Sequence, residues 1–422
     1  MLLQKRVRFW KSGFAVISTM MLLCISGCND KPSEESWVAE NESETQVSSQ
    51  RIQDKGYDLP IDETERKEAE SDCKKTMESI SDIYECADKG EMTNVILDKE
   101  TIQKMKERMK QKGYSFTTME AYSNIENYGK VDGFLKECRK GKSGSVVFYE
   151  LHSDGGIGRE KFIFDGKDMY FLETNAIWNK ENEPGISYIS YTRIKEWEYT
   201  NEGWLCYELC VPQPPEVTEV VNGNCMVRIT PMASKQREMS EKCVQGIGYM
   251  GNNLLCSNWD TEHMEQLDYN GLYEYLYAMK YKRAFQPKDD LNGIPKEEFE
   301  RLMMEYLPVT AKQVREYAVF DEEKQTYAWE RLGCLNYAPN SFGTSLPEVT
   351  DIKENEDGTV TLTVNAVCDM MMCEDAVITH ELMVKFAGDG SFKYLGNKIL
   401  DDGIKSIPDY QYRIPKFENP TE

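Results

Sequence analysis

Apolar residues recur at intervals of three and four along the first folded part of the chain, which is the spacing of one face of an α-helix. The predicted helices cover residues 71–87, 98–113 and 118–140. Asp98 stands where an N-cap would accept a hydrogen bond, and Gly113 where a helix would end. The pattern therefore predicts three amphipathic helices before any strand.

The pattern then changes to alternating apolar and polar residues, which is typical of β-strands. The strand-like runs in this part are SVVFYEL, REKFIF, KDMYFLE, ISYISY, IKEWEY, WLCYELCV and CMVRI. Asp165-Gly166, between the second and third runs, predicts a tight hairpin with a type I′ turn. Short connections of this kind predict an antiparallel meander.

The rest of the chain repeats this order of elements. A helix is predicted over residues 262–283, two shorter helices follow in PKEEFERLMMEYL and TAKQVREYA, and strands return from TYAWERL to FKYLGNKI. Helices followed by a meander give an α+β fold with helices on one face of a curved sheet. We predict two such domains, residues 73–257 and 258–422. The element order of the second resembles that of cystatin or NTF2-like proteins.

The first 27 residues have the features of a secretory signal peptide. Residues 1–13 carry Lys and Arg without acids, and residues 14–27 are apolar or small. This run of about 14 residues is shorter than the roughly 20 that cross a bilayer. The letters ISG before Cys28 resemble the lipobox of bacterial lipoproteins, in which the cysteine takes a diacylglycerol. We expect cleavage before Cys28 and lipidation of its thiol. The alternative is a secreted or uncleaved chain with an unrelated cysteine.

Acidic and polar residues dominate after Cys28. Residues 28–72 hold 14 acidic and 5 basic residues, so they cannot bury enough apolar surface to offset the entropy of ordering. We predict a disordered, lipidated tether. Removal of residues 1–27 takes four positive charges from a net charge of −23 and leaves about −27. This charge argues against nucleic-acid binding and against attraction of the whole chain to an anionic membrane.

Eleven of the 13 cysteines lie beyond Cys28. None forms a CxxC pair, which makes a structural zinc site a poor explanation for them. An exported chain permits disulfides. The candidate pairs are Cys368 with Cys373, Cys243 with Cys256, and Cys210 with Cys225. Buried, reduced thiols are the alternative.

Aromatic residues are frequent, with 24 Tyr and 7 Trp. Six of them are candidates for a recognition surface, because they recur on one predicted helix or along neighbouring strands. They are Tyr273, Tyr277, Tyr281, Trp197, Tyr199 and Trp204. Aromatic rings bury large areas and also make good recognition surfaces, so core packing is the alternative explanation.

No catalytic set is recognisable. The histidines are His152, His263 and His380, and none has a metal-binding or triad-like sequence context. Two Asp/Asn-Gly segments fail the calcium-loop pattern, because a lysine occupies the first ligand position of each. We therefore expect no metal, no cofactor and no catalytic residues.

Four runs carry a resemblance to a known group of proteins. They are GSVVFYELHSDGGIGREKFIFDGKDMY, ISYISYTRIKEWEYT, GNNLLCSNWD and DGTVTLTVNAVCDMMMCEDAVITHELMVKF. With the lipobox, they resemble a family of uncharacterised lipoproteins of Clostridia-type Gram-positive bacteria. The resemblance implies a lipid-anchored protein of unknown function on the extracytoplasmic face of the cell membrane, and it supplies no catalytic residues.

A non-enzymatic binding or adaptor module at the cell envelope is the function we expect from these features, with a protein or small-molecule ligand. Two alternatives stay open. One is an envelope hydrolase that uses carboxylates, for which no pair of Asp or Glu can be chosen from the sequence. The other is a purely structural envelope component.

Replacing the lipidated cysteine tests the predicted anchor. Cys28→Ala should abolish incorporation of a labelled fatty acid into the protein, because no thiol then remains at the cleavage site. Cys24→Ala is the matched control and should leave the labelling intact. Labelling that persists in Cys28→Ala would place the anchor elsewhere.

Overall fold

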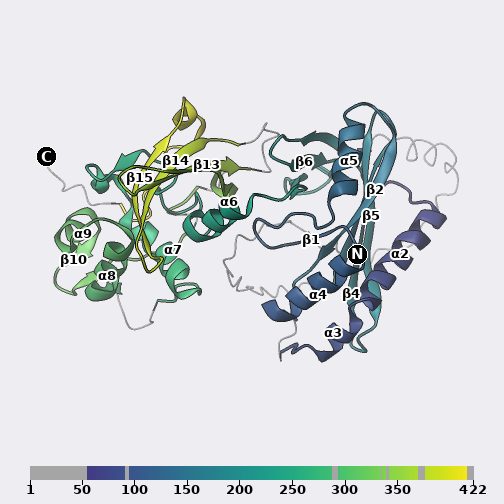
Figure 1. Ribbon diagram of the computed structural model, residues 1–422, viewed down its shortest axis with the longest axis horizontal. Coiled ribbons are helices and arrows are strands. Elements are labelled where there is room, and N and C mark those ends of the chain that lie inside the picture. Colours follow the sequence, from purple (N-terminus) through teal and green to yellow (C-terminus); the bar gives the residue numbers. More distant parts are fainter. Residues whose placement is uncertain are drawn as a thin grey trace, which may run out of the picture.

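The computed structural model describes residues 55–90, 95–287, 293–333, 335–338, 342–368 and 376–415. It has the predicted α+β architecture, in two halves that lie side by side (Figure 1). The first half, residues 55–230, contains α2 (Glu63–Glu78), α3 (Ser81–Cys86), α4 (Lys99–Gln111), β1 (Phe116–Thr118), α5 (Gly129–Cys138), β2 (Gly144–Leu151), β3 (Ile157–Phe164), β4 (Met169–Trp178), β5 (Pro184–Tyr199), β6 (Trp204–Leu209) and β7 (Asn224–Arg228).

Strands β1 to β7 form one seven-stranded sheet in sequential order. Neighbouring strands are antiparallel except β1 and β2, which are parallel. Successive residues of a strand point to opposite faces, so Phe148 and Tyr149 of β2 belong to two different cores. One core includes apolar residues of α2, α3 and α4, and the other includes those of α5. The predicted meander is confirmed. The prediction of helices on one face of the sheet is wrong for this half, because α2, α3 and α4 contribute to the core on one face and α5 to the core on the other.

The predicted hairpin at Asp165-Gly166 is confirmed, because residues 165–168 connect β3 to β4. Its turn type differs from the prediction. Gly166 has φ 105° but Asp165 does not have a positive φ, whereas a type I′ turn needs two residues with positive φ. Instead, the Asp165 carboxylate accepts hydrogen bonds of 2.8 Å from the N–H groups of Lys167 and Asp168.

Part of the predicted tether has a defined structure. Residues 55–59 run along the edge of β5, where the N–H of Leu59 donates to Tyr191 at 3.0 Å and the N–H of Arg193 donates to Gly56 at 2.7 Å. α2 then begins at Glu63, nine residues before the predicted end of the tether at residue 72. The tether prediction is therefore wrong for residues 55–72.

The acidic residues of α2 explain this error. α2 packs on β3, β4 and β5 and buries Ala69 and Cys73. Its Asp72 forms an ion pair of 2.9 Å with Arg159, whose side chain is fully buried. The amino-acid composition alone suggests that such an acidic residue is exposed to solvent. In the structure Asp72 neutralises Arg159 of the sheet.

The predicted helix over residues 118–140 is only half correct. Phe116–Thr118 form β1, residues 119–128 are a loop, and α5 starts at Gly129. The loop pairs with β1 through reciprocal backbone hydrogen bonds between Phe116 and Glu126. Apolar residues in the loop mimic helical spacing, yet they pack into separate cores.

The second half, residues 234–415, contains short helices and two sheets. Its elements are α6 (Ser234–Met239), β8 (Trp259–Asp260), α7 (Tyr269–Tyr281), β9 (Ile294–Pro295), α8 (Lys296–Tyr306), α9 (Ala311–Tyr317), β10 (Phe320–Asp321), β11 (Thr326–Tyr327), β12 (Leu346–Glu354), β13 (Val360–Val367), β14 (Thr379–Phe386) and β15 (Phe392–Ile399). The larger sheet has the order β12-β13-β14-β15-β8, and the smaller has the order β10-β11-β9. The meander of four long strands agrees with the pattern.

α7 is shorter than the predicted helix over residues 262–283. It starts after Asp268, whose carboxylate accepts a hydrogen bond of 2.8 Å from the N–H of Gly271. The same carboxylate accepts one of 2.7 Å from the hydroxyl of Tyr410. Asp268 therefore both caps the helix and fastens the C-terminal segment, a role that the local pattern cannot show.

The boundary between the two halves lies earlier in the chain than predicted. The core of the second half includes Met239, Cys243 and Cys256, which the predicted boundary at 257/258 assigns to the first domain. α6 packs on β12. The change from one core to the other therefore lies between Ile229, in the first core, and Met239, in the second.

A buried ion pair joins the two halves. Arg228 at the end of β7 donates to both carboxylate oxygens of Glu348 in β12, at 2.6 Å each. The side chains are 5% and 2% exposed. The indole N–H of Trp204 also donates to Glu348 at 3.2 Å. Nearby, the hydroxyl of fully buried Tyr122 donates to the carbonyl of Pro347.

The remaining donors of Arg228 are satisfied by backbone carbonyls. Its Nε donates to Thr230 at 2.9 Å and its Nη2 to Glu202 at 3.1 Å. A buried guanidinium with all its groups engaged has a fixed position. Arg228 therefore sets the orientation of β12 relative to the first sheet.

Removing one partner of this ion pair should destabilise the protein. Arg228→Leu leaves the Glu348 carboxylate buried without its cation, so we expect the free energy of unfolding at pH 7 to fall by about 3–5 kcal/mol. The double variant Arg228→Leu/Glu348→Leu should recover most of this loss. Denaturant unfolding measures both values, and a double variant as unstable as the single one would contradict the assignment.

The same variant should show a pH dependence. Burial raises the pKa of Glu348, against the opposing effects of Arg228 and Trp204. A carboxyl with a raised folded-state pKa contributes stability that is present below its unfolded pKa and is lost as pH rises through its folded pKa. Arg228→Leu removes the charge that opposes the effect of burial. The loss of unfolding free energy that this variant causes should therefore become smaller as pH falls from 7 toward 4. A loss independent of pH would contradict this.

Candidate functional site

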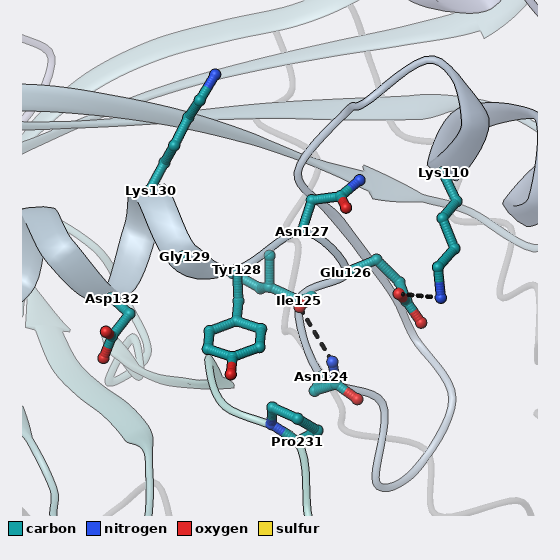
Figure 2. A pocket seen from close by; sticks show the side chains of 10 residues that line it. All are labelled: Lys110, Asn124, Ile125, Glu126, Asn127, Tyr128, Gly129, Lys130, Asp132 and Pro231. Carbon is teal, nitrogen blue, oxygen red and sulfur yellow. Dashed lines mark hydrogen bonds and ion pairs between the residues drawn. The ribbon is translucent and has the colours of Figure 1, made fainter.

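A surface groove in the first half is the candidate functional site. Its volume is about 950 Å³. Four parts of the chain form it: the end of α4, the loop that leads into α5, the first turn of α5, and the segment after β7. The lining residues are Lys110, Asn124, Ile125, Glu126, Asn127, Tyr128, Gly129, Lys130, Asp132 and Pro231 (Figure 2).

The loop of residues 119–128 is held firmly on its inner side. The N–H of Ile125 donates to Arg228 at 3.1 Å, and Ile125 is fully buried. Asn127 has φ 53°, a left-handed conformation that asparagine tolerates better than most residues. Its side-chain amide donates to the carbonyl of Tyr114 at 2.8 Å. These bonds fix the backbone from which the groove side chains project.

One wall of the groove combines an aromatic ring with a polar amide. Figure 2 shows the ring of Tyr128 projecting to the side of the backbone on which Asn124 and Pro231 also lie. The Asn124 side-chain N–H donates to the carbonyl of Ile125 at 3.0 Å, so its side-chain oxygen remains as an acceptor. Lys130 points away from these groups. A ring face beside amide and carboxylate groups suits a ligand with both apolar faces and hydroxyl or amide groups.

Both carboxylates that line the groove are paired with lysines. Glu126 forms an ion pair of 2.8 Å with Lys110. Asp132 forms one of 2.8 Å with Lys136 and accepts a hydrogen bond of 2.6 Å from the hydroxyl of Tyr199. The groove therefore presents balanced charges, which favours a ligand of low net charge.

The pKa of the Asp132 carboxyl is lowered from its ordinary value. Partial burial acts to raise this pKa, but the hydrogen bonds from Lys136 and Tyr199, with the charge of Lys136, outweigh burial. Asp132 is therefore ionised at neutral pH. A general acid needs a raised pKa, so Asp132 is suited to accept hydrogen bonds from a ligand.

Five of the six predicted recognition aromatics are wholly or partly buried. Tyr273, Tyr199 and Trp204 are at most 4% exposed, so they cannot form a surface. Trp197 and Tyr277 pack against the cores. The prediction of a recognition surface is wrong for the three buried rings. A strand or helix face that packs against a core has the same residue spacing in the sequence as a face that is exposed. The exception is Tyr281, which is 41% exposed.

The cysteines of the predicted disulfides are not paired as expected. Cys210, Cys243 and Cys256 are single thiols, and the last two are buried. Burial raises the pKa of Cys243 and of Cys256 to about 12. Cys243 and Cys256 both lie in the core of the second half, where packing accounts for them.

The other predicted cysteine positions are less informative. Cys225 lies on the edge strand β7 and its thiol donates to the carbonyl of Gly223 at 3.7 Å, so the structure does not pair it with Cys210. Cys368 is buried. Its predicted partner Cys373 and the predicted lipidation site Cys28 lie outside the described residues.

The histidines occupy unrelated positions. His380 is fully buried, where its ring nitrogens contact the Tyr249 hydroxyl at 2.8 Å and the Asn397 side-chain oxygen at 2.6 Å. Burial lowers the pKa of His380 to about 4. His263 is exposed beside Asp260. Among the described residues, no group of His, Cys, Asp and Glu is arranged to hold a metal ion.

Sequence reasoning missed the groove because residues 119–128 fall within the predicted helix over residues 118–140. A signal was present in YSNIENYGK, residues 122–130, which combines two asparagines with a glycine. Asn and Gly favour turns and left-handed conformations. This cluster marks a loop better than a helix, although it does not show what the loop faces.

Comparison with known proteins places the chain in a family. A family model matches residues 66–413, and the chain belongs to this family of unknown function, DUF6070. No curated protein and no solved structure matches the chain. The likeness of the second half to cystatin or NTF2-like proteins therefore stays a prediction. No helix within the described ranges is long and apolar enough to cross a membrane.

The hydrogen bond from Tyr199 can be removed with little change of shape. Tyr199→Phe should raise the pKa of Asp132 and lower the free energy of unfolding at pH 7 by about 1–2 kcal/mol, because a charged acceptor loses a donor.

A lowered carboxyl pKa gives stability that is present above the unfolded pKa and lost as pH falls through the folded pKa. The difference between wild type and Tyr199→Phe should therefore vanish in acid. NMR titration of Asp132 and unfolding at pH 7 and pH 3 measure both effects. An unchanged pKa of Asp132 would refute the role assigned to Tyr199.

Proposed function

We propose that this protein is a lipid-anchored, extracytoplasmic binding module of the cell envelope, and that the groove beside α5 is its ligand site. The groove carries the proposal, because it places a ring, an amide and two lysine-paired carboxylates on a backbone that hydrogen bonds hold in place. Such a combination binds by hydrogen bonds and ring contacts. The ligand class it fits is hydroxyl- or amide-rich and of low net charge, such as a glycan chain or a peptide.

The N-terminal sequence supports the proposed location. A basic segment, a short apolar run and ISG before Cys28 match the order of a lipoprotein signal. Two or three acyl chains suffice for stable anchoring without a membrane-spanning helix. Residues 29–54 would then connect the membrane to the edge of β5, where the described chain begins.

The charge state of the carboxyls favours binding over hydrolysis. Among the described carboxyls whose pKa departs from its ordinary value, Glu348 alone has a raised pKa, and it is held between the two halves by Arg228. A carboxylate hydrolase needs a protonated acid in its cleft. The groove supplies Asp132 in the opposite state.

A panel of ligands tests the proposal. The processed chain would be unfolded thermally with glycans, cell-wall fragments and peptides. A ligand at a hundred times its dissociation constant adds about 2.7 kcal/mol, which corresponds to a rise in Tm of roughly 5–10 °C. Tyr128→Ala should abolish the rise, because it removes the ring that projects into the groove.

Tyr412→Ala is the matched control. Tyr412 is 36% exposed and lies in the second half, so its loss should leave the ligand-induced rise intact. Equal loss in both variants, or turnover of the ligand by the purified chain, would defeat the binding proposal.

A further inference from the structure

A second surface, at the C-terminal end of α7, combines exposed cations with aromatic rings. It consists of Tyr277, Tyr281, Lys282, Arg283 and Phe285, which we call the α7 tip. In the sequence, residues 278–290 carry four basic and two acidic residues, in a chain of net charge −23. This local excess of positive charge is opposite in sign to the protein as a whole.

The rings of the α7 tip form a connected group that is anchored in the core. The ring centres of Tyr277 and Tyr281 are 4.5 Å apart, and those of Tyr277 and Phe285 are 5.2 Å apart. Buried Tyr273 backs Phe285 at 5.2 Å. Tyr281 is 41% exposed at the outer end. The group is therefore a rigid surface with one ring presented to the outside.

The two outer cations differ from the neighbouring Lys280 in their ion pairing. Lys280 is paired with Glu305. In contrast, neither Lys282 nor Arg283 has an ion pair within the part of the chain that the structure describes. Arg283 donates to the Tyr277 hydroxyl at 3.1 Å and lies over its ring at 6.0 Å. The guanidinium is thus oriented by the rings while its charge stays available.

The backbone at Lys282 adds an independent observation. Lys282 ends α7 with φ 53°, a left-handed conformation for which glycine is the usual residue. A lysine there is less favourable than a glycine. Uncommon conformations of this kind recur at binding surfaces. At this position the lysine provides an exposed cation where glycine would serve the helix end better.

We propose that the α7 tip docks on the phosphate headgroups of an anionic lipid surface. Tyrosine is enriched at the headgroup level of membranes, and Lys and Arg are attracted by anionic lipids. The inference rests on the proposed anchor at Cys28, because two cations alone give only weak attraction. A tether raises the effective concentration of a second contact, so a weak contact suffices to orient an already attached protein.

The negative charge of the whole protein does not prevent this contact. Exposed charges separated by more than about 8–10 Å are largely screened at physiological salt. The surface that approaches the headgroups is the α7 tip itself, which carries Lys282 and Arg283, and the neighbouring Lys280 is already paired with Glu305. Docking there would leave the groove in the first half open to its ligand.

Hydrogen exchange on vesicles tests the proposal. The processed chain, with a histidine tag in place of residues 1–28, is held on vesicles by a nickel-chelating lipid, so natural lipidation is not needed. Vesicles with phosphatidylglycerol are compared with vesicles of phosphatidylcholine alone. We expect slower exchange of the backbone amides of residues 280–286 on the anionic vesicles only, and loss of this slowing at high salt.

A charge-removing variant makes the test specific. Lys282→Gly with Arg283→Gln should weaken the docking equilibrium about 30-fold, given the usual contribution of each cation near an anionic leaflet. Lys282→Gly suits the left-handed backbone, so this variant should remain folded with an unchanged or higher Tm. Lys167→Ser/Lys405→Ser removes two exposed cations elsewhere and should leave the slowing of exchange intact.

The outcomes separate the two proposals. No slowing on anionic vesicles, or equal slowing on both kinds of vesicle, would overturn docking by the α7 tip whatever the natural anchor is. Slowing that the control variant abolishes as well would show non-specific charge attraction and would also overturn it. Failure of acyl labelling at Cys28 in cells would instead remove the anchor while the vesicle result stands.

Discussion

The buried ion pair between Arg228 and Glu348 is the interaction on which the arrangement of the two halves depends. It links β7 of the first half to β12 of the second half. The indole N–H of Trp204 also donates a hydrogen bond to the Glu348 carboxylate. A buried pair contributes little net stability, since desolvation offsets attraction, but it penalises every arrangement that separates its partners. Its role here is to specify one orientation of the halves.

The groove loop is attached to the same residue, through the backbone carbonyl of Arg228 and not through its guanidinium. Arg228 accepts the backbone hydrogen bond of Ile125 in the groove loop, and the hydroxyl of Tyr122 reaches across to Pro347 in the second half. Tyr122 has φ 58°, an unusual conformation for a tyrosine, which its full burial stabilises. The loop that carries Asn124 and Tyr128 is therefore fixed by both halves. Two packed halves make a preorganised site, which lowers the entropy that a ligand must lose on binding.

Different surfaces of the protein carry different charges. Acids of α2 pair with Arg159 and Lys161 of the sheet beneath them. The groove carries paired charges, and the α7 tip carries two cations that no carboxylate of the described ranges pairs with. A strongly acidic exterior keeps such a chain soluble, so local departures from it are the informative features.

The sequence determined the features that depend on short-range pattern. Period-two alternation located both meanders, Asp165-Gly166 located a hairpin, and the N-terminal order of basic, apolar and small residues predicts the anchor at Cys28. These features need no partner far away in the chain, because a strand face, a turn and a signal peptide are local.

Only the tertiary structure decided which residues meet. Trp204 and Tyr273 have the spacing of surface candidates, yet they are buried, because the segments that cover them are distant in sequence. The sequence pattern assigns Asp72 to an acidic tether, whereas in the structure it forms an ion pair with Arg159 of the sheet. The groove joins α4, α5 and the segment after β7, which are brought together by sheet pairing. Such contacts follow from long-range packing, and the local pattern holds no information about them.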